Sequence, residues 1–277
     1  MATGGALAPT AAACYEAWRI RVRAHRDAAA RAGLERGSEE TWASAVESFT
    51  ADPRRRDEPA LDALLKLVEP GETWLDIGAG AGRYALPLAL AGASVVAIEP
   101  SSAMANALRG GAQQHAVAGV RLIEQEWPMA HPPTADVALI AHVGYGTEKI
   151  GPFLDAMEAA AQRLCVALML ARAPSSAADR YWLPVHGVGR PSLPALPEFL
   201  RVLLARGRLF EVRLLPRYEQ PRSDPQADLR FLRRHLRAEP GTPADDRLLA
   251  ELEQQRAAGG SLHPVDVPLG LVTWAPR

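Results

Sequence analysis

The chain has 277 residues, of which 48 % are hydrophobic and 23 % charged, which suits one large α/β domain with a modest addition. Its 31 Lys and Arg against 32 Asp and Glu leave a net charge of -1, which excludes a general attraction to nucleic acid or to anionic membranes. Cys14 and Cys165 are far apart and outside any metal-ligand spacing, and no apolar run is long enough to cross a bilayer. We therefore expect a cytoplasmic protein with no bound metal and with neither nucleic-acid nor membrane partners.

The N-terminal residues 1–60 are predicted to form a helical cap in front of a main domain, residues 61–277. Helices are expected between Tyr15 and Val68, because apolar residues recur at helical spacing before the turn at Glu69-Pro70-Gly71. Tyr15, Trp18 and Trp42 could close over a ligand, although aromatic residues at helical spacing usually belong to a core. Two arginine groups, 54–56 and 230–237, are interpreted as solvated helix faces.

Strands and helices then alternate. The predicted strands are Thr73–Ile77, Val95–Ile98, Val120–Glu124, Val137–Ala141 and Cys165–Ala171, with helices at Gly82–Leu90, at Ser102–Arg109 and after Pro152. Regular alternation of this kind predicts a parallel sheet with helices on both sides, a Rossmann-like three-layer sandwich. Asp136, just before the fourth strand, is interpreted as a solvent-facing turn residue.

The final third is less regular. Residues Pro174–Pro197 are rich in Pro and Gly, and we expect an ordered loop over a site, within an insertion at residues 174–207. The elements predicted after it are a helix at Pro197–Arg206, a strand at Leu209–Leu215, helices near Ala227–Arg237 and Pro243–Ala258, and a last strand at Leu269–Trp274.

The segment Trp74-Leu75-Asp76-Ile77-Gly78-Ala79-Gly80-Ala81-Gly82 places three glycines between a strand and a helix. Such a turn lets the backbone approach a ligand, and the helix N-terminus adds free N–H groups. Glu99, at the end of the next strand, could accept hydrogen bonds from both ribose hydroxyls. These features occur in NAD-binding and in S-adenosylmethionine-binding folds, and Gly80-x-Gly82-x-x-Ala85 also fits the dinucleotide fingerprint.

Three features favour S-adenosylmethionine. Asp76, two residues before Gly78, would attract the ammonium group of a methionine moiety and repel a pyrophosphate. Glu126-Trp127 follows the third strand, where a carboxylate could take the adenine amino group and an aromatic ring could flank the base. The order of elements continues past the sixth predicted strand into helices and a final apolar strand.

On these residues the chain resembles the class I S-adenosylmethionine-dependent methyltransferase family. Asp76 to Gly82 match its first motif, Glu99 its ribose-binding acid, Glu126 its adenine-contacting acid and Asp136 to His142 its fourth strand. The likeness covers about Leu61 to Ala171, and departs from the family where Trp127 replaces the more usual small residue. It implies a seven-stranded sheet with an antiparallel last strand, and S-adenosylmethionine as cofactor. The implied cofactor-binding residues are Asp76, Gly78, Gly80, Gly82, Glu99, Glu126, Trp127 and Ala141.

The methyl acceptor is expected to be a small molecule, and in-line methyl transfer requires positioning more than a fixed catalytic triad. Candidates for contact with the reacting groups follow the fourth strand: His142 as a general base, Tyr145 as a second catalytic residue or pocket wall, and Glu148. The candidate substrate residues are Tyr181, Trp182 and His186.

Several alternatives stay open at this point. Arg83 could reach the methionine carboxylate or only cover a helix, and the protein could be a monomer or a homodimer. An NAD(P)-dependent oxidoreductase would use the same glycine turn without the role given to Asp76. A non-catalytic accessory protein would bind S-adenosylmethionine but lack an acceptor pocket.

Overall fold

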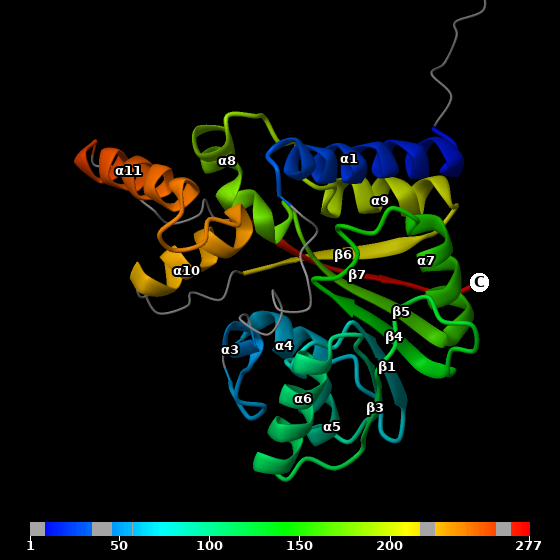
Figure 1. The fold of residues 1–277 in the computed structure, drawn as a ribbon. Helices are drawn as coiled ribbons and strands as arrows, with labels where there is room; N and C mark the ends of the chain where they lie inside the picture. Colours follow the sequence, from blue (N-terminus) through cyan, green and yellow to red (C-terminus); the bar gives the residue numbers. More distant parts are fainter. Residues whose placement is uncertain (1–8, 35–45, 57, 217–224, 259–266) are drawn as a thin grey trace, which may run out of the picture.

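The computed structural model in Figure 1 describes residues 9–34, 46–56, 58–216, 225–258 and 267–277. Trp42 lies outside them. One seven-stranded sheet runs through the molecule in the order β3-β2-β1-β4-β5-β7-β6. The strands are β1 Thr73–Ile77, β2 Ser94–Ile98, β3 Val120–Ile123, β4 Ala135–Ala141, β5 Ala161–Leu170, β6 Phe210–Leu215 and β7 Leu269–Trp274. β1 to β5 pair in parallel, and β7 is antiparallel to both β5 and β6, so the predicted Rossmann-like sheet with an antiparallel last strand is confirmed.

Helices cover both faces of this sheet (Figure 1). They are α1 Ala11–Arg31, α3 Val46–Phe49, α4 Pro59–Leu65, α5 Ala85–Leu90, α6 Ser102–Gln114, α7 Ile150–Ala160, α8 Asp179–His186, α9 Leu196–Ala205, α10 Pro225–Leu236 and α11 Pro243–Ala257, with a 3-10 helix η1 at Pro174–Ala178. Within residues 1–60, the described helices α1 and α3 are not set apart from the rest of the fold, because α1 packs on α7 and α9 while α3 packs on α6. The division at residue 60 stays a prediction.

Side chains alternate between the two faces along each buried strand, as the pleat requires. In β4, Ala138 and Ile140 pack on the side of α1, α7 and α9, whereas Val137 and Leu139 pack on the side of α4 and α5. Asp136 accepts hydrogen bonds from the backbone N–H of Thr73 at 2.8 Å and from its hydroxyl at 2.7 Å. The interpretation of Asp136 as a solvent-facing turn residue is therefore wrong, since it joins the start of β4 to β1.

A buried ion network fastens α7 to the segment after α9. Glu158 of α7 accepts hydrogen bonds from Arg206 at 2.9 Å, from Arg208 at 2.6 Å and from the indole N–H of Trp274 at 3.2 Å. The Glu158 and Arg206 side chains are each only 2 % exposed. Burial opposes ionisation of Glu158, but the hydrogen bonds from the two arginines hold its pKa below the ordinary value.

The segment Pro174–Pro197, expected to be a loop, instead contains η1 and α8. Tyr181, Trp182 and Val185 are buried on one side of α8 against α10 and α11, and Leu232, Leu236 and Leu248 complete this cluster. The apolar residues at positions i, i+1 and i+4 thus stabilise a helix despite Pro184. The three helices stand together at one end of the molecule (Figure 1).

Candidate functional site

The glycine turn joins β1 to α5, and its three glycines have positive φ angles of +74° at Gly78, +57° at Gly80 and +85° at Gly82. A Cβ atom at Gly78 would lie 2.7 Å from Val143 Cγ2, and one at Gly82 would lie 3.0 Å from Leu86 Cγ. Around Gly80 a Cβ atom would meet nothing within 4 Å. Gly78 and Gly82 are therefore required by packing, whereas Gly80 leaves open space beside a half-buried stretch of backbone.

Asp76 stands next to this turn, at the carboxyl end of β1. Its side chain is 2 % exposed, and its Oδ2 atom has no hydrogen-bond partner. Burial, and then the nearby charge of Glu99, raise the pKa of Asp76 to about 7, while a hydrogen bond from the backbone N–H of Ala85 acts in the opposite direction. A buried carboxylate without a partner is unfavourable, so this position calls for a cationic ligand group or a proton.

Glu99 follows β2 and fixes the shape of the turn from the neighbouring strand. Its Oε2 accepts the N–H of Gly80 at 2.8 Å, and its Oε1 accepts the N–H of Ser101 at 2.9 Å. The side chain is 7 % exposed. Each carboxylate oxygen has more than one acceptor direction, so both retain capacity for a ligand hydroxyl.

A cationic cluster borders the turn on the α4 side. Glu58 accepts hydrogen bonds from Arg83 at 2.9 Å and from Arg55 at 2.5 Å. Burial raises the pKa of Glu58, but the two arginines lower it by more, so its pKa lies below the ordinary value. The Arg55 side chain is 14 % exposed, and its Nη2 is buried without a partner. Arg55 was expected on a solvated helix face, which is wrong. Arg83 is held by Glu58, with Tyr84 beside it.

His142 and Tyr145 follow β4, the strand adjacent to β1. His142 has a positive φ of +59°, and its Nδ1 is buried without a partner. Burial, and then the charge of Arg83, lower the pKa of His142 to about 4, so its imidazole is neutral at pH 7. The Tyr145 ring is in the core, where its hydroxyl oxygen accepts the N–H of Leu170 at 2.8 Å. Tyr145 thus joins the loop after β4 to the end of β5.

Glu148 does not reach this site. It accepts a hydrogen bond from Arg23 at 2.9 Å and a second one from Arg26, both on α1. The candidate Glu148 therefore ties α1 to the loop that follows β4.

The remaining predicted cofactor residues lie along the same edge of the sheet. Glu126 is exposed shortly after β3, and Trp127 is half-buried, with its indole N–H donating to the Phe153 carbonyl at 3.2 Å. Ala141 ends β4 opposite Leu168 of β5. Their roles in ligand binding stay predictions.

The structure does not place Tyr181, Trp182 and His186 at the sheet edge. Tyr181 and Trp182 are core residues of the α8, α10 and α11 cluster, and the His186 ring lies 4.3 Å from the Trp182 ring, measured between centroids. The His186 Nε2 hydrogen-bonds to the Leu236 carbonyl at 2.7 Å. The expectation that Tyr181, Trp182 and His186 cover a substrate is therefore wrong, because the packing of α8 on α10 and α11 takes up their side chains.

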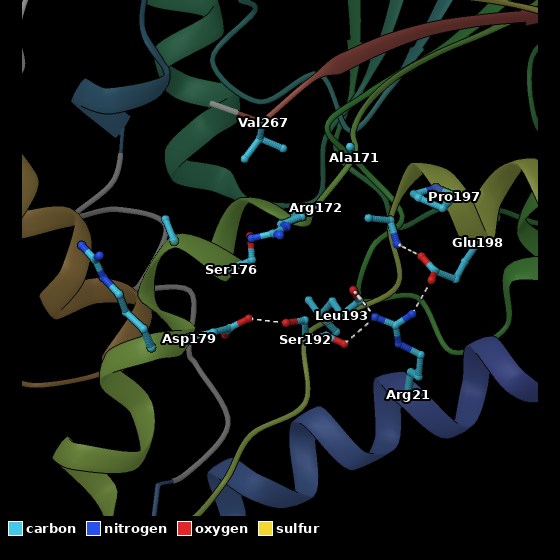
Figure 2. A pocket seen from close by; sticks show the side chains of 13 residues that line it. Arg21, Ala171, Arg172, Ser176, Asp179, Ser192, Leu193, Pro197, Glu198 and Val267 are labelled. Carbon is cyan, nitrogen blue, oxygen red and sulfur yellow. Dashed lines mark hydrogen bonds and ion pairs between the residues drawn. The ribbon is translucent and has the colours of Figure 1, made fainter. Parts of the chain in front are cut away.

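Two groups near the site were not anticipated. Glu58 comes from outside the recognised motif, and only the chain fold brings it to Arg83. Arg172 directly follows Ala171 after β5 and lines a cavity of about 430 Å³ (Figure 2). The sequence signal for Arg172 was its place after the fifth predicted strand, at the edge where open α/β sheets bind ligands.

A family model described as "Methyltransferase domain" matches residues 75–159, which run from β1 to α7 and include Asp76, the glycine turn and Glu99. This part of the chain is therefore a methyltransferase domain. The match agrees with the resemblance seen in the sequence, which implies S-adenosylmethionine as cofactor. No curated protein is detectably similar to the chain in sequence.

Solved structures agree with the methyltransferase fold. The YcgJ protein of Bacillus subtilis is 15 % identical, with a TM-score of 0.55, and the match covers 79 % of this chain and 98 % of that one. A protein from Thiobacillus denitrificans is 19 % identical, with a TM-score of 0.55 and coverages of 85 % and 97 %. A third, from Geobacter sulfurreducens, is 20 % identical, with a TM-score of 0.53 and coverages of 84 % and 98 %. The last two are described as S-adenosylmethionine-dependent methyltransferases in complex with S-adenosylhomocysteine.

The residues of the methyltransferase site fit this cofactor. The Oδ2 atom of Asp76 lacks a partner that an ammonium group would supply, and the space beside Gly80 admits a ligand close to the backbone. In the described part of the chain, no three His, Cys, Asp or Glu side chains gather as metal ligands. Nor is any helix in the described ranges both long enough and apolar enough to cross a membrane.

Proposed function

We propose that this methyltransferase transfers a methyl group from S-adenosylmethionine to a small-molecule acceptor by in-line displacement. The observation that carries the proposal is the buried, unpartnered oxygen of Asp76 beside the open space at Gly80. A group with a positive charge at this position relieves the cost that burial imposes on the carboxylate.

Each of the predicted cofactor residues then has a distinct task. Asp76 binds the ammonium group of the methionine moiety, and Glu99 binds the ribose hydroxyls through the acceptor capacity that Gly80 and Ser101 leave unused. Glu126 and Trp127 hold the adenine base at the end of β3. Gly78 and Gly82 keep the turn in the shape that these contacts need.

The bound cofactor supplies an activated methyl group on a sulfonium centre. The protein's part is to hold the acceptor in line with it and to exclude water. His142 is neutral above its pKa of about 4, so its imidazole can accept a proton from an acceptor that enters protonated. Tyr145 shapes the wall behind it through its hydrogen bond to Leu170.

A small acceptor is favoured over nucleic acid by the net charge of -1. Cys14 and Cys165 are both free, which supports the prediction of a reducing compartment such as the cytoplasm. A monomer and a homodimer are both compatible with the proposal.

Calorimetric titration with S-adenosylhomocysteine, and with NADH in parallel, tests the cofactor assignment. We expect S-adenosylhomocysteine alone to bind. Binding of NADH alone would return the chain to the oxidoreductases. Tight binding of S-adenosylhomocysteine without methylation of any member of a broad acceptor panel would instead favour the non-catalytic accessory protein.

A further inference from the structure

We infer that the methyl acceptor is a small carboxylate, bound by Arg172 in the cavity beyond the end of β5; this rests on the proposed function. The cavity, about 430 Å³, lies where β5 ends and β7 begins, with Ala171 and Val267 on its wall. Arg21 of α1 and Glu198 of α9 form another side (Figure 2). Its volume is in the range of small-molecule sites.

The cavity continues the series of predicted cofactor contacts along the sheet edge. Glu126 and Glu99 follow β3 and β2, and Asp76 lies near the end of β1, which is next in the sheet; β4 and β5 come after it. The assigned contacts pass from adenine to ribose to methionine in the same direction. Neighbouring strands are about 4.8 Å apart, so β5 is roughly 10 Å from β1. An acceptor bound beyond β5 therefore approaches from the methionine side, across β4 and His142.

The two acidic residues on the cavity wall already have cationic partners. Glu198 accepts hydrogen bonds from Arg21 at 2.5 Å and from the Ala195 N–H at 2.9 Å. Asp179 accepts hydrogen bonds from Arg190 at 2.9 Å and from the Ser192 hydroxyl at 2.5 Å. Arg21 also donates to the Ser192 and Leu193 carbonyls at 3.2 and 3.3 Å. These pairs fix the wall and cancel their own charges.

Arg172 differs from these residues. Within the described ranges its guanidinium has no hydrogen bond or ion pair, although it lines the cavity. Figure 2 shows Arg172 near the η1 residue Ser176, while Arg21 reaches toward Glu198 from the α1 side. A cationic guanidinium therefore lines the cavity with its donors available to a ligand.

A carboxylate fits this arrangement better than a doubly charged phosphate. One planar guanidinium matches one carboxylate in a two-bond contact. The other two arginines on the wall already have partners, since Arg21 pairs with Glu198 and Arg180 lies over the Tyr181 ring, so one guanidinium is left for the ligand, which suits a monoanion. The wall residues Ala171, Leu193 and Pro197 supply apolar contacts for the hydrocarbon part of the acceptor.

The test is a calorimetric titration of benzoate and hexanoate into the full-length protein, with and without saturating S-adenosylhomocysteine. Benzamide is the uncharged control. We expect millimolar binding of at least one carboxylate and at least tenfold weaker binding of benzamide, since a charge-assisted contact is lost. Arg172→Gln should weaken carboxylate binding at least tenfold and leave the affinity for S-adenosylhomocysteine unchanged. Arg121→Gln, at the exposed opposite edge of the sheet on β3, should change neither.

Equal binding of benzoate and benzamide, unchanged carboxylate affinity in Arg172→Gln, or no binding of either carboxylate at about 10 mM would overturn the inference. Failure of S-adenosylhomocysteine to bind would instead refute the proposed function. The two failures are distinguishable because the carboxylates are also titrated without S-adenosylhomocysteine.

Discussion

Replacing Asp76 with asparagine should stabilise the ligand-free protein while it weakens cofactor binding. Burial, together with the charge of Glu99, raises the pKa of Asp76 from 3.8 to about 7. The folded protein therefore holds this proton more tightly than the unfolded chain does, and stability falls as the pH rises from 3.8 to about 7. The difference between the two values corresponds to about 4 kcal/mol, at roughly 1.4 kcal/mol for each pH unit.

Asparagine has nearly the same shape and no charge, but it still pays for burying a polar amide. We therefore expect Asp76→Asn to recover about 1–3 kcal/mol at pH 8 and little at pH 4. For a chain of this size that gain raises the melting temperature by about 2–10 °C. Thermal denaturation of the wild type and the variant at both pH values measures it. Asp62→Asn, an exposed substitution on α4, is the matched control.

The same substitution should lower the affinity for S-adenosylhomocysteine about 10- to 100-fold, because the ammonium group loses a charged partner. Calorimetric titration at pH 8 gives this number. A variant whose melting temperature and affinity both match the wild type would refute the reasoning. If the variant is stabilised but binds S-adenosylhomocysteine as tightly as the wild type, Asp76 carries a buried charge but does not contact the ammonium group.

Three further predictions follow from other residues. Gly80→Ala should lower the free energy of unfolding by about 1–2 kcal/mol, because alanine is strained at this positive φ. Its affinity for S-adenosylhomocysteine, measured by calorimetry, should fall more than about tenfold; an affinity equal to that of the wild type would place Gly80 outside the site. Glu158→Gln should lower the unfolding free energy in urea by about 1–3 kcal/mol, because Arg206 and Arg208 lose the buried carboxylate that they share while Arg206 keeps its ion pair with the exposed Asp155; no measurable loss would contradict this. Because the pKa of His142 is lowered from 6.5 to about 4, the wild type should lose stability as the pH falls through this range. His142→Asn should remove this pH dependence, which thermal denaturation at pH 5 and 7 measures. The same pH dependence in both proteins would argue against a buried His142.

The sheet could be predicted from sequence because its inner strands are nearly continuous apolar runs, which is typical of parallel strands buried on both faces. Val95–Ile98 was recognised in this way, and the structure adds only Ser94 to it. The helix α8 could not be predicted from sequence, since Pro184 and the surrounding Pro and Gly residues indicate a loop. Its stability comes from contacts with α10 and α11, which begin 46 and 64 residues after the start of α8.

The same distinction holds for the site. Asp76 and Glu99 could be found because each directly follows or ends a strand next to the glycine turn, so local spacing carries the information. The ion pair between Glu58 and Arg83 could not be found from the sequence, because it depends on how α4 packs against α5. The pKa of His142 was also beyond the sequence, since it results from burial and from the charge of Arg83.

The position of β7 bears on how the chain folds. β7 is the last strand in sequence, yet it lies between β5 and β6 and pairs with both. Until β7 is in place, β5 and β6 present unpaired backbone edges, and the apolar surface around Trp274 is incomplete. During synthesis the sheet therefore cannot close from the N-terminus onward. We expect refolding limited by this long-range pairing, with an incomplete sheet that is prone to association at high protein concentration.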